Sequence, residues 1–246
     1  MPKIVPNLLD FREQGGDSTF FDTNTYFPSA NRTVLLFTYA IRLGLPPPPP
    51  IIPAISGNNL TWVLVANQLF AHGGVDRARI SIFRAVGPAP TSGVTRVQYA
   101  ITQLRHATTV IEFANTDIGN LGANAIVGTP PSEQDDPGTL TPSIILPAAE
   151  DPENASLGIL AYGEPNPIVV PGVGITVLKN NPTTEGGGQQ VQFTTQPVTL
   201  MDWTLSGIAD AQAQIAIELR NATPSGPAAG PQILGRPAFV SGNLIT

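Results

Sequence analysis

The sequence predicts an all-β protein, an antiparallel β-sandwich or jelly roll with extended N- and C-terminal arms. Three observations predict this fold class. Short apolar runs alternate with turn-forming residues, several of the runs have a two-residue period, and no stretch has the helical period that crossover helices would need. A chain of 246 residues is long enough for one large β-sandwich domain.

The strand-like runs are short and are separated by breakers, since the chain contains 26 prolines and 24 glycines. Such runs of β-branched and aromatic residues between turn signals are typical of strands in an all-β fold. The predicted strands are Phe20–Phe27, Thr33–Ile41, Leu60–Phe70, Ala78–Val86, Val94–Thr102, Thr108–Ala114, Ser156–Tyr162, Gly174–Leu178, Gln189–Thr195 and Gln212–Leu219.

Three of these runs show the alternation of a strand that is buried on one face. Ile80 and Ile82 share one face, opposite Arg79, Ser81 and Phe83. In the same way Val191 and Phe193 alternate with glutamine and threonine. In the last run one face carries Ala213, Ile215, Ile217 and Leu219, and the other carries Gln212, Gln214, Ala216 and Glu218.

The chain is predicted to divide into an irregular N-terminal arm, Met1–Thr19, a β-sandwich domain over residues 20–222, and a C-terminal arm over residues 223–246. Five consecutive prolines, Pro46–Pro50, form an extended spacer of about 15 Å, at roughly 3.1 Å per residue. A rigid loop that covers a sheet edge is the preferred interpretation of this spacer, with a peptide ligand for a partner as the alternative.

Both arms carry apolar residues that a short flexible segment cannot bury by itself. We therefore predict that the arms dock on a partner and gain affinity from backbone hydrogen bonds and a few apolar anchors. Packing back onto the chain's own sandwich is the alternative. The predicted partner-binding residues are Ile4, Val5, Leu8, Leu9 and Phe11 in the N-terminal arm and Ile233, Leu234, Phe239, Val240 and Leu244 in the C-terminal arm.

Composition limits the classes of function. The net charge is −6 and charged residues make up only 12% of the chain, so we expect no basic surface that could neutralise nucleic-acid phosphates. Cysteine is absent, which excludes disulfides and thiolate chemistry. No apolar run is long enough to span a membrane, and the first residues lack the pattern of a secretory signal. No cofactor is expected.

Candidate catalytic residues are few. His72 and His106 are the two histidines, and neither is near a nucleophile motif, so structural roles are preferred for both. Glu112 and Glu218 are acidic residues on apolar strands, and two facing carboxylates would suit glycoside hydrolysis. A structural ion pair with Arg79 or Arg84 is the preferred interpretation, because buried carboxylates need partners.

Two loops are rich in oxygen-bearing side chains, and calcium takes six to eight oxygen ligands. Neither loop has the spacing of an EF-hand, and Asx residues also form turns without a metal. Turn formation is therefore preferred over metal binding. The residues are Asn115, Asp117, Asn120 and Asn124 in one loop and Glu133, Asp135 and Asp136 in the other.

An ordered series of motifs spans roughly Ile51 to Arg220. It comprises Leu60-Thr61-Trp62, Arg77–Pro90, Val110–Phe113, Ala123–Val127 and a late pair formed by Asp202-Trp203 and Ile215–Leu219. The series resembles a β-sandwich module that recurs in bacteriophage structural proteins and bacterial surface proteins. The resemblance implies a display, adhesion or capsid-associated role and supplies no catalytic residues.

The expectation that follows is a non-enzymatic virion structural protein, a capsid decoration or cement protein that is assembled in the host cytoplasm. Its expected partners are the major capsid protein or other virion proteins and further copies of itself in a homo-oligomer. The alternative is a carbohydrate- or receptor-binding module of a phage tail or cell surface, which predicts an exposed aromatic platform. Trp62, Tyr99, Tyr162 and Trp203 are its candidates.

Overall fold

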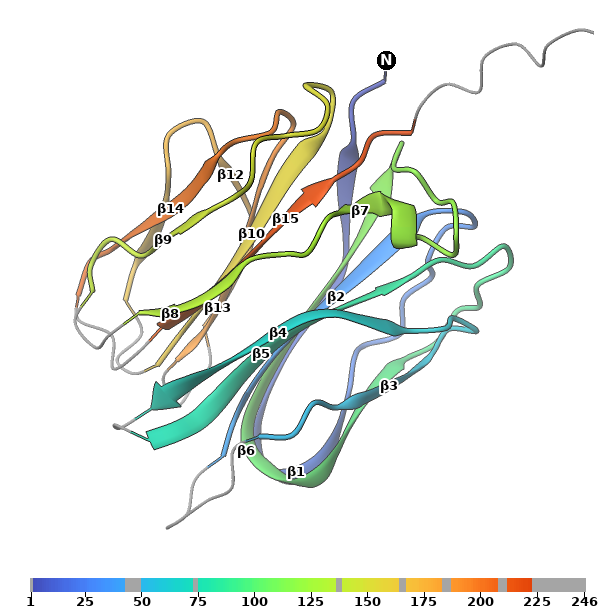
Figure 1. Cartoon of the computed structure of the whole chain (residues 1–246). Coiled ribbons are helices and arrows are strands. Elements are labelled where there is room, and N and C mark those ends of the chain that lie inside the picture. Colours follow the sequence, from blue (N-terminus) through green and yellow to red (C-terminus); the bar gives the residue numbers. More distant parts are fainter. Residues whose placement is uncertain are drawn as a thin grey trace, which may run out of the picture.

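The computed structural model describes residues 2–42, 50–72, 75–135, 139–163, 167–182, 187–207 and 212–222, without the side chains of residues 72, 75–77, 134 and 135. Within these ranges the chain consists of β-strands and loops, with one 3-10 turn, η1 (Ala123–Ala125). The strands form antiparallel sheets that pack face to face (Figure 1). The predicted all-β sandwich is therefore confirmed.

The first sheet contains the N-terminal strands in the order β1-β6-β2-β5-β4, with β3 paired to β6. Every pairing in it is antiparallel. The predicted run Thr33–Ile41 coincides with β2, which lies in the middle of the sheet and is buried along its whole length. The strands are β1 (Val5–Asp22), β2 (Thr33–Ile41), β3 (Ala54–Gly57), β4 (Val63–His72), β5 (Val75–Ala85) and β6 (Thr95–Ala114).

The second sheet has the order β12-β13-β10-β15-β7, with β8 paired to β15, and a separate three-stranded sheet has the order β11-β14-β9. The predicted run Gln212–Leu219 coincides with β15. The strands of the second sheet are β7 (Ile126–Val127), β8 (Ser132–Asp135), β10 (Ala155–Tyr162), β12 (Thr176–Pro182), β13 (Gly188–Thr194) and β15. The strands of the third sheet are β9 (Ser143–Ile145), β11 (Val169–Pro171) and β14 (Leu200–Leu205).

The central core lies between the first and second sheets. Ile80 and Ile82 of β5 meet Val191 and Phe193 of β13 within one buried cluster, together with the inward residues of β2, β6, β10 and β15. The faces predicted from alternation are therefore correct for these strands. Ile4 also belongs to this cluster, with only 1% of its surface exposed.

The outer face of the first sheet is covered by the ends of its own longest strands. β1 and β6 bend together, with register shifts in β1 around Gly15 and Ser18 (Figure 1). Gly16 has φ +97°, a conformation that suits glycine at such a bulge. Beyond the bend, residues 18–22 of β1, residues 95–100 of β6 and β3 form a layer that we call the first cover. It buries a second apolar cluster that includes Leu36, Val97 and Tyr99.

The outer face of the second sheet is covered by the three-stranded sheet β11-β14-β9, which we call the second cover. Met201 and Trp203 of β14 are buried against Leu160, Tyr162 and Ala216. The glutamines on this face are therefore buried as well. Gln190 Nε2 donates to the Val169 carbonyl at 2.9 Å, which satisfies part of one buried amide. The molecule thus has four β-layers that enclose three apolar clusters.

Three sequence-based assignments are wrong. Met1–Thr19 is not an irregular arm, because Val5–Asp22 pairs with β6 and Ile4 is in the core. The predicted strand Phe20–Phe27 is the end of β1 followed by a loop in which Tyr26 makes an isolated bridge. The two runs Val94–Thr102 and Thr108–Ala114 are one continuous strand, β6. The spacer Pro46–Pro49 and the C-terminal arm from residue 223 lie outside the described residues.

Candidate functional site

The predicted N-terminal binding residues have three different environments. Ile4 is a core residue, and Leu9 packs against the cluster under the first cover. Val5, Leu8 and Phe11 are exposed, to 54%, 38% and 44%. The Lys179 ammonium lies 3.1 Å from the Phe11 ring centroid, so that ring is partly engaged within the chain. The candidates Ile233, Leu234, Phe239, Val240 and Leu244 lie outside the described residues.

Glu112 and Glu218 do not form a pair. Glu112 projects from the outer face of the first sheet, on the same side as Val110, whereas Glu218 projects from the outer face of the second sheet, on the same side as Ala216. The central core lies between them. The facing carboxylates that glycoside hydrolysis would need are therefore not formed by these two residues.

The predicted ion pairs of these carboxylates are also wrong. Glu112 accepts hydrogen bonds from Asn7 Nδ2, the Ser29 backbone N–H and the Ser29 hydroxyl, at 2.8 to 3.1 Å. Arg79 instead donates to the Pro50 carbonyl and to Asn67, and Arg84 donates to the Leu121 carbonyl. Neutral donors from the β1 edge and the loop before β2 replace the expected guanidinium.

His106 lies inside the bend of β6. Its ring stacks on Phe21, with centroids 4.4 Å apart, and meets the edge of Tyr99. Complete burial lowers the pKa of His106 to about 3, so the imidazole is neutral near pH 7. Its enclosed position gives no access to a substrate. The His72 side chain is outside the described part of the structure.

The Asx-rich loop after β6 is organised by hydrogen bonds within the chain. Asp117 Oδ1 accepts the Gly119 N–H, and Asn115 Nδ2 donates to the Lys3 carbonyl. Asn115 and Asn120 adopt positive φ angles, as Asx residues in turns often do. Among the residues that the structure describes, no three His, Cys, Asp or Glu side chains gather as metal ligands.

The aromatic residues proposed for a glycan platform are mostly internal. Tyr99, Tyr162 and Trp203 are at most 2% exposed, and Trp62 packs against the cluster under the first cover. The exposed aromatic rings are phenylalanines, including Phe20 and Phe27. The exposure of these two phenylalanines was not predictable from the sequence, because both stand in apolar, strand-like surroundings.

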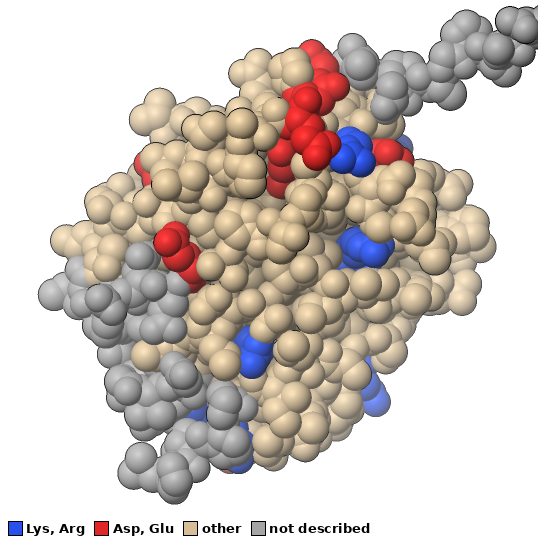
Figure 2. Space-filling view, in the orientation of Figure 1, with Lys and Arg blue, Asp and Glu red and all other residues tan. Residues whose placement is uncertain are grey.

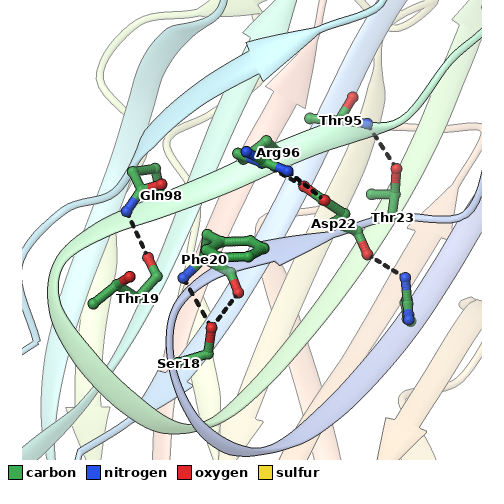
Figure 3. Close-up of polar contacts among 9 residues, drawn as sticks. Ser18, Thr19, Phe20, Asp22, Thr23, Thr95, Arg96 and Gln98 are labelled. Carbon is green, nitrogen blue, oxygen red and sulfur yellow. Dashed lines mark hydrogen bonds and ion pairs between the residues drawn. The ribbon is translucent and has the colours of Figure 1, made fainter.

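An open groove of about 510 Å³ lies on the first cover. It is lined by Thr19 of β1, Ile52, Ala54 of β3, and Gln98, Tyr99 and Ala100 of β6. Figure 3 shows the adjoining contacts, in which Arg96 and Asp22 meet across β6 and β1 through two hydrogen bonds of 2.8 Å. This ion pair lowers the pKa of Asp22. Gln98 donates to the Thr19 carbonyl and fixes the groove wall.

Exposed apolar side chains border this groove. Phe20 is 46% exposed and has the Arg96 guanidinium 4.5 Å from its ring centroid. Ile51 and Ile52 are 43% and 38% exposed. The first cover therefore presents an open groove. The Arg96–Asp22 ion pair and the exposed apolar side chains of Phe20, Ile51 and Ile52 lie beside it.

The outer face of the second cover carries several exposed apolar side chains beside Asp202 and Thr204 of β14. Ile145 and Leu200 stand opposite each other across β9 and β14, and Val170 stands opposite Thr204 across β14 and β11. Ile145, Ile168 and Val170 are at least half exposed, and Leu200 is 46% exposed. Figure 2 shows one side of the molecule, on which acidic side chains gather at the top of the view beside a basic one and the remaining charged side chains are few and scattered.

No protein-family model matches the sequence, and no curated protein or solved structure is similar enough to it to indicate a relationship. In the ranges that the structure describes, no helix has the length and hydropathy that crossing a membrane requires.

Proposed function

We propose that this chain is a non-enzymatic structural protein of a virion, a decoration or cement protein that bridges neighbouring subunits of the shell. The observation that carries the proposal is the presence of exposed apolar side chains on both covers, which include Phe20, Ile51 and Ile52 at the first and Ile145, Ile168, Val170 and Leu200 at the second. The two covers lie on opposite sides of the central sandwich (Figure 1). A molecule with an adhesive face on each side can hold two neighbours together.

The chemistry of these faces suits protein partners. Exposed apolar residues that are fixed on a sheet lose little conformational freedom on binding, which favours association. Exposed apolar side chains that gather on one face and are bordered by polar residues are typical of protein interaction sites. The low charge of the whole chain, with 12 basic and 18 acidic residues among 246, reduces the desolvation cost of covering large areas. The resemblance to bacteriophage structural modules points the same way.

The proposed mechanism is additive burial of interface area. Each contact removes apolar surface from water at roughly 25 cal/mol per Å², and many copies together raise the barrier to shell disruption. Further copies of the chain and the major capsid protein are the proposed partners. The C-terminal arm is proposed to add a third contact.

Two measurements on the virus particles that carry this chain test the proposal. The first is co-sedimentation of the chain with the particles, and the second is the temperature at which the particles release their genome. The full chain is expected to sediment with the particles and to raise that temperature. Ile145→Lys with Leu200→Lys should abolish binding through the second cover, and Ile51→Lys with Ile52→Lys should do so through the first. Leu121→Lys, at an exposed position outside both covers, is the matched control. Full binding by both double variants would refute the bridging role.

A further inference from the structure

A small cavity lies where the end of β15 meets two loops. It has a volume of about 120 Å³, and it is lined by segment 127–131 after β7, segment 146–148 after β9, and the carboxylates Glu150 and Glu218. Most of the remaining lining side chains are apolar, including Val127, Leu146 and prolines. The cavity is separate from the groove of the first cover and from the outer face of the second cover.

Glu218 is buried at this cavity with an incomplete set of partners. Only 6% of the residue is exposed. Oε1 accepts the Asn154 side-chain N–H at 2.6 Å and the Glu150 backbone N–H at 3.2 Å. Within the described part of the chain, Oε2 accepts no hydrogen bond and no cation pairs with this carboxylate. Arg220 is nearby, but its guanidinium pairs with Glu150 Oε2 at 2.6 Å.

Glu112 provides an internal comparison. It is buried to a similar extent, at 8% exposure, yet both of its oxygens accept hydrogen bonds from Asn7 or Ser29. Burying a carboxylate costs free energy unless hydrogen bonds and opposite charge compensate for the lost water. Glu112 is compensated by its neighbours. Glu218 Oε2 has no partner within the described part of the chain, and this residue lines the cavity, where the oxygen keeps some accessible surface.

We propose that this cavity binds an organic cation, a primary ammonium or guanidinium group on a short apolar stem. Glu218 would receive the charged group, Glu150 with its partner Arg220 would form part of the wall, and the prolines with Leu146 and Val127 would contact the stem. Charge-assisted hydrogen bonds to a buried carboxylate are strong and directional.

The size and lining of the cavity favour an organic cation over a metal ion. Calcium needs six to eight oxygen ligands, whereas most lining side chains here are hydrocarbon. The volume of about 120 Å³ suits a short alkyl chain. The inference does not depend on the proposed virion role.

Calorimetric titration of the full chain with n-butylammonium chloride tests the proposal, with n-butanol as the neutral analogue of the same shape. The ammonium is expected to bind at least about tenfold more tightly than the alcohol, because the alcohol leaves the buried charge unpaired. Equal affinity for the two, or no measurable binding of the ammonium, would overturn the proposal. Displacement of the ammonium by equimolar calcium would also overturn it in favour of a metal site.

Two variants and one control test which residues bind the ammonium group. Glu218→Gln keeps the shape and removes the charge, and is expected to weaken ammonium binding by about tenfold or more. Glu150→Gln, at a more exposed residue that does not threaten folding, should weaken it by a smaller factor. Glu112→Gln should leave affinity unchanged. Unaltered affinity in both Glu218→Gln and Glu150→Gln would refute the site. Thermal unfolding of each variant verifies the fold.

The source of the cation is distinguished by a second pair of probes. Nα-acetyl-lysine amide and Nα-acetyl-arginine amide carry the same charged groups on a peptide unit. If either binds as tightly as n-butylammonium, the cavity accepts a basic side chain of a protein. If only n-butylammonium binds, the natural ligand is a free amine. Both results support a cation site at Glu218.

Discussion

His106 makes the stability of the fold sensitive to mild acid. Burial lowers its pKa from the usual 6.5 to about 3, so between these values the unfolded chain binds a proton that the folded chain does not. This contribution to stability is complete above about pH 6.5 and is lost as the pH falls toward 3. Between pH 7 and about pH 5 the free energy of unfolding in urea should fall by up to about 2 kcal/mol.

The variant His106→Phe isolates this contribution. Phenylalanine keeps the stacking on Phe21 but cannot be protonated, so its unfolding free energy should change less over the same pH interval. The interval avoids the titration of Asp22, whose pKa is lowered by Arg96 and which therefore loses its contribution only in stronger acid. A pH dependence identical in His106→Phe and the original chain would show that His106 is not the sensor.

Gly158 permits the close approach of the second cover. A Cβ at this position would lie 2.5 Å from Met201 Cγ and 3.0 Å from Trp203 Cζ2. We expect Gly158→Ala to lower the free energy of unfolding by about 1 to 3 kcal/mol through overpacking, as measured by urea denaturation. Gly207→Ala is the control, because a Cβ there meets nothing within 4 Å. Equal stability of the two variants would contradict the packing argument.

At the level of residues, the alternation in the sequence predicted which side chains face the central core but not what lies on the other face. Gln190, Gln192, Gln212 and Gln214 stand on the polar side of their strands, yet all four are at most 1% exposed. The cover above them consists of strands as short as three residues, which have too few positions to show a period.

The N-terminal strand is an integral element of the sandwich. Ile4 is 1% exposed within the central cluster, whereas its neighbour Val5 is 54% exposed. Ile4→Ala should therefore lower the free energy of unfolding by about 2 to 5 kcal/mol, through lost burial and a residual cavity. Val5→Ala should change it by no more than about 0.5 kcal/mol. Chemical denaturation measures both. Equal effects would restore the interpretation of this segment as a detached arm.

Most strands were predictable as elements, and the failures have identifiable causes. β2 and β15 are central and mostly apolar, so their composition fixes their bounds. β1 is an edge strand that contains Asp10, Glu13 and two adjacent glycines. It is held by backbone pairing with β6, which leaves no hydrophobic period in the sequence. The polar stretch inside β6 similarly concealed the continuity of that strand through its bend.

The four-layer arrangement belongs to the molecule as a whole. It depends on β1 and β6 each serving two layers, since Ile111 and Phe113 of β6 face the central core while Val97 and Tyr99 face the outer cluster. Composition predicted sheets, but it carried no information about a strand that changes layer. The groove and apolar face of the covers follow from that arrangement, which is why neither candidate surface was visible in the sequence.

The C-terminal arm remains a prediction, and its removal separates folding from assembly. The described members of the three apolar clusters lie between residues 4 and 219, so a chain ending at Ala222 keeps all of these described members. We expect this chain to unfold at the same temperature as the full chain, because it keeps all of these core residues. It should bind virions more weakly in co-sedimentation, because Ile233, Leu234, Phe239, Val240 and Leu244 are lost as anchors. Undiminished binding would assign assembly to the covers alone, whereas a lower unfolding temperature would mean that the arm packs on its own sandwich.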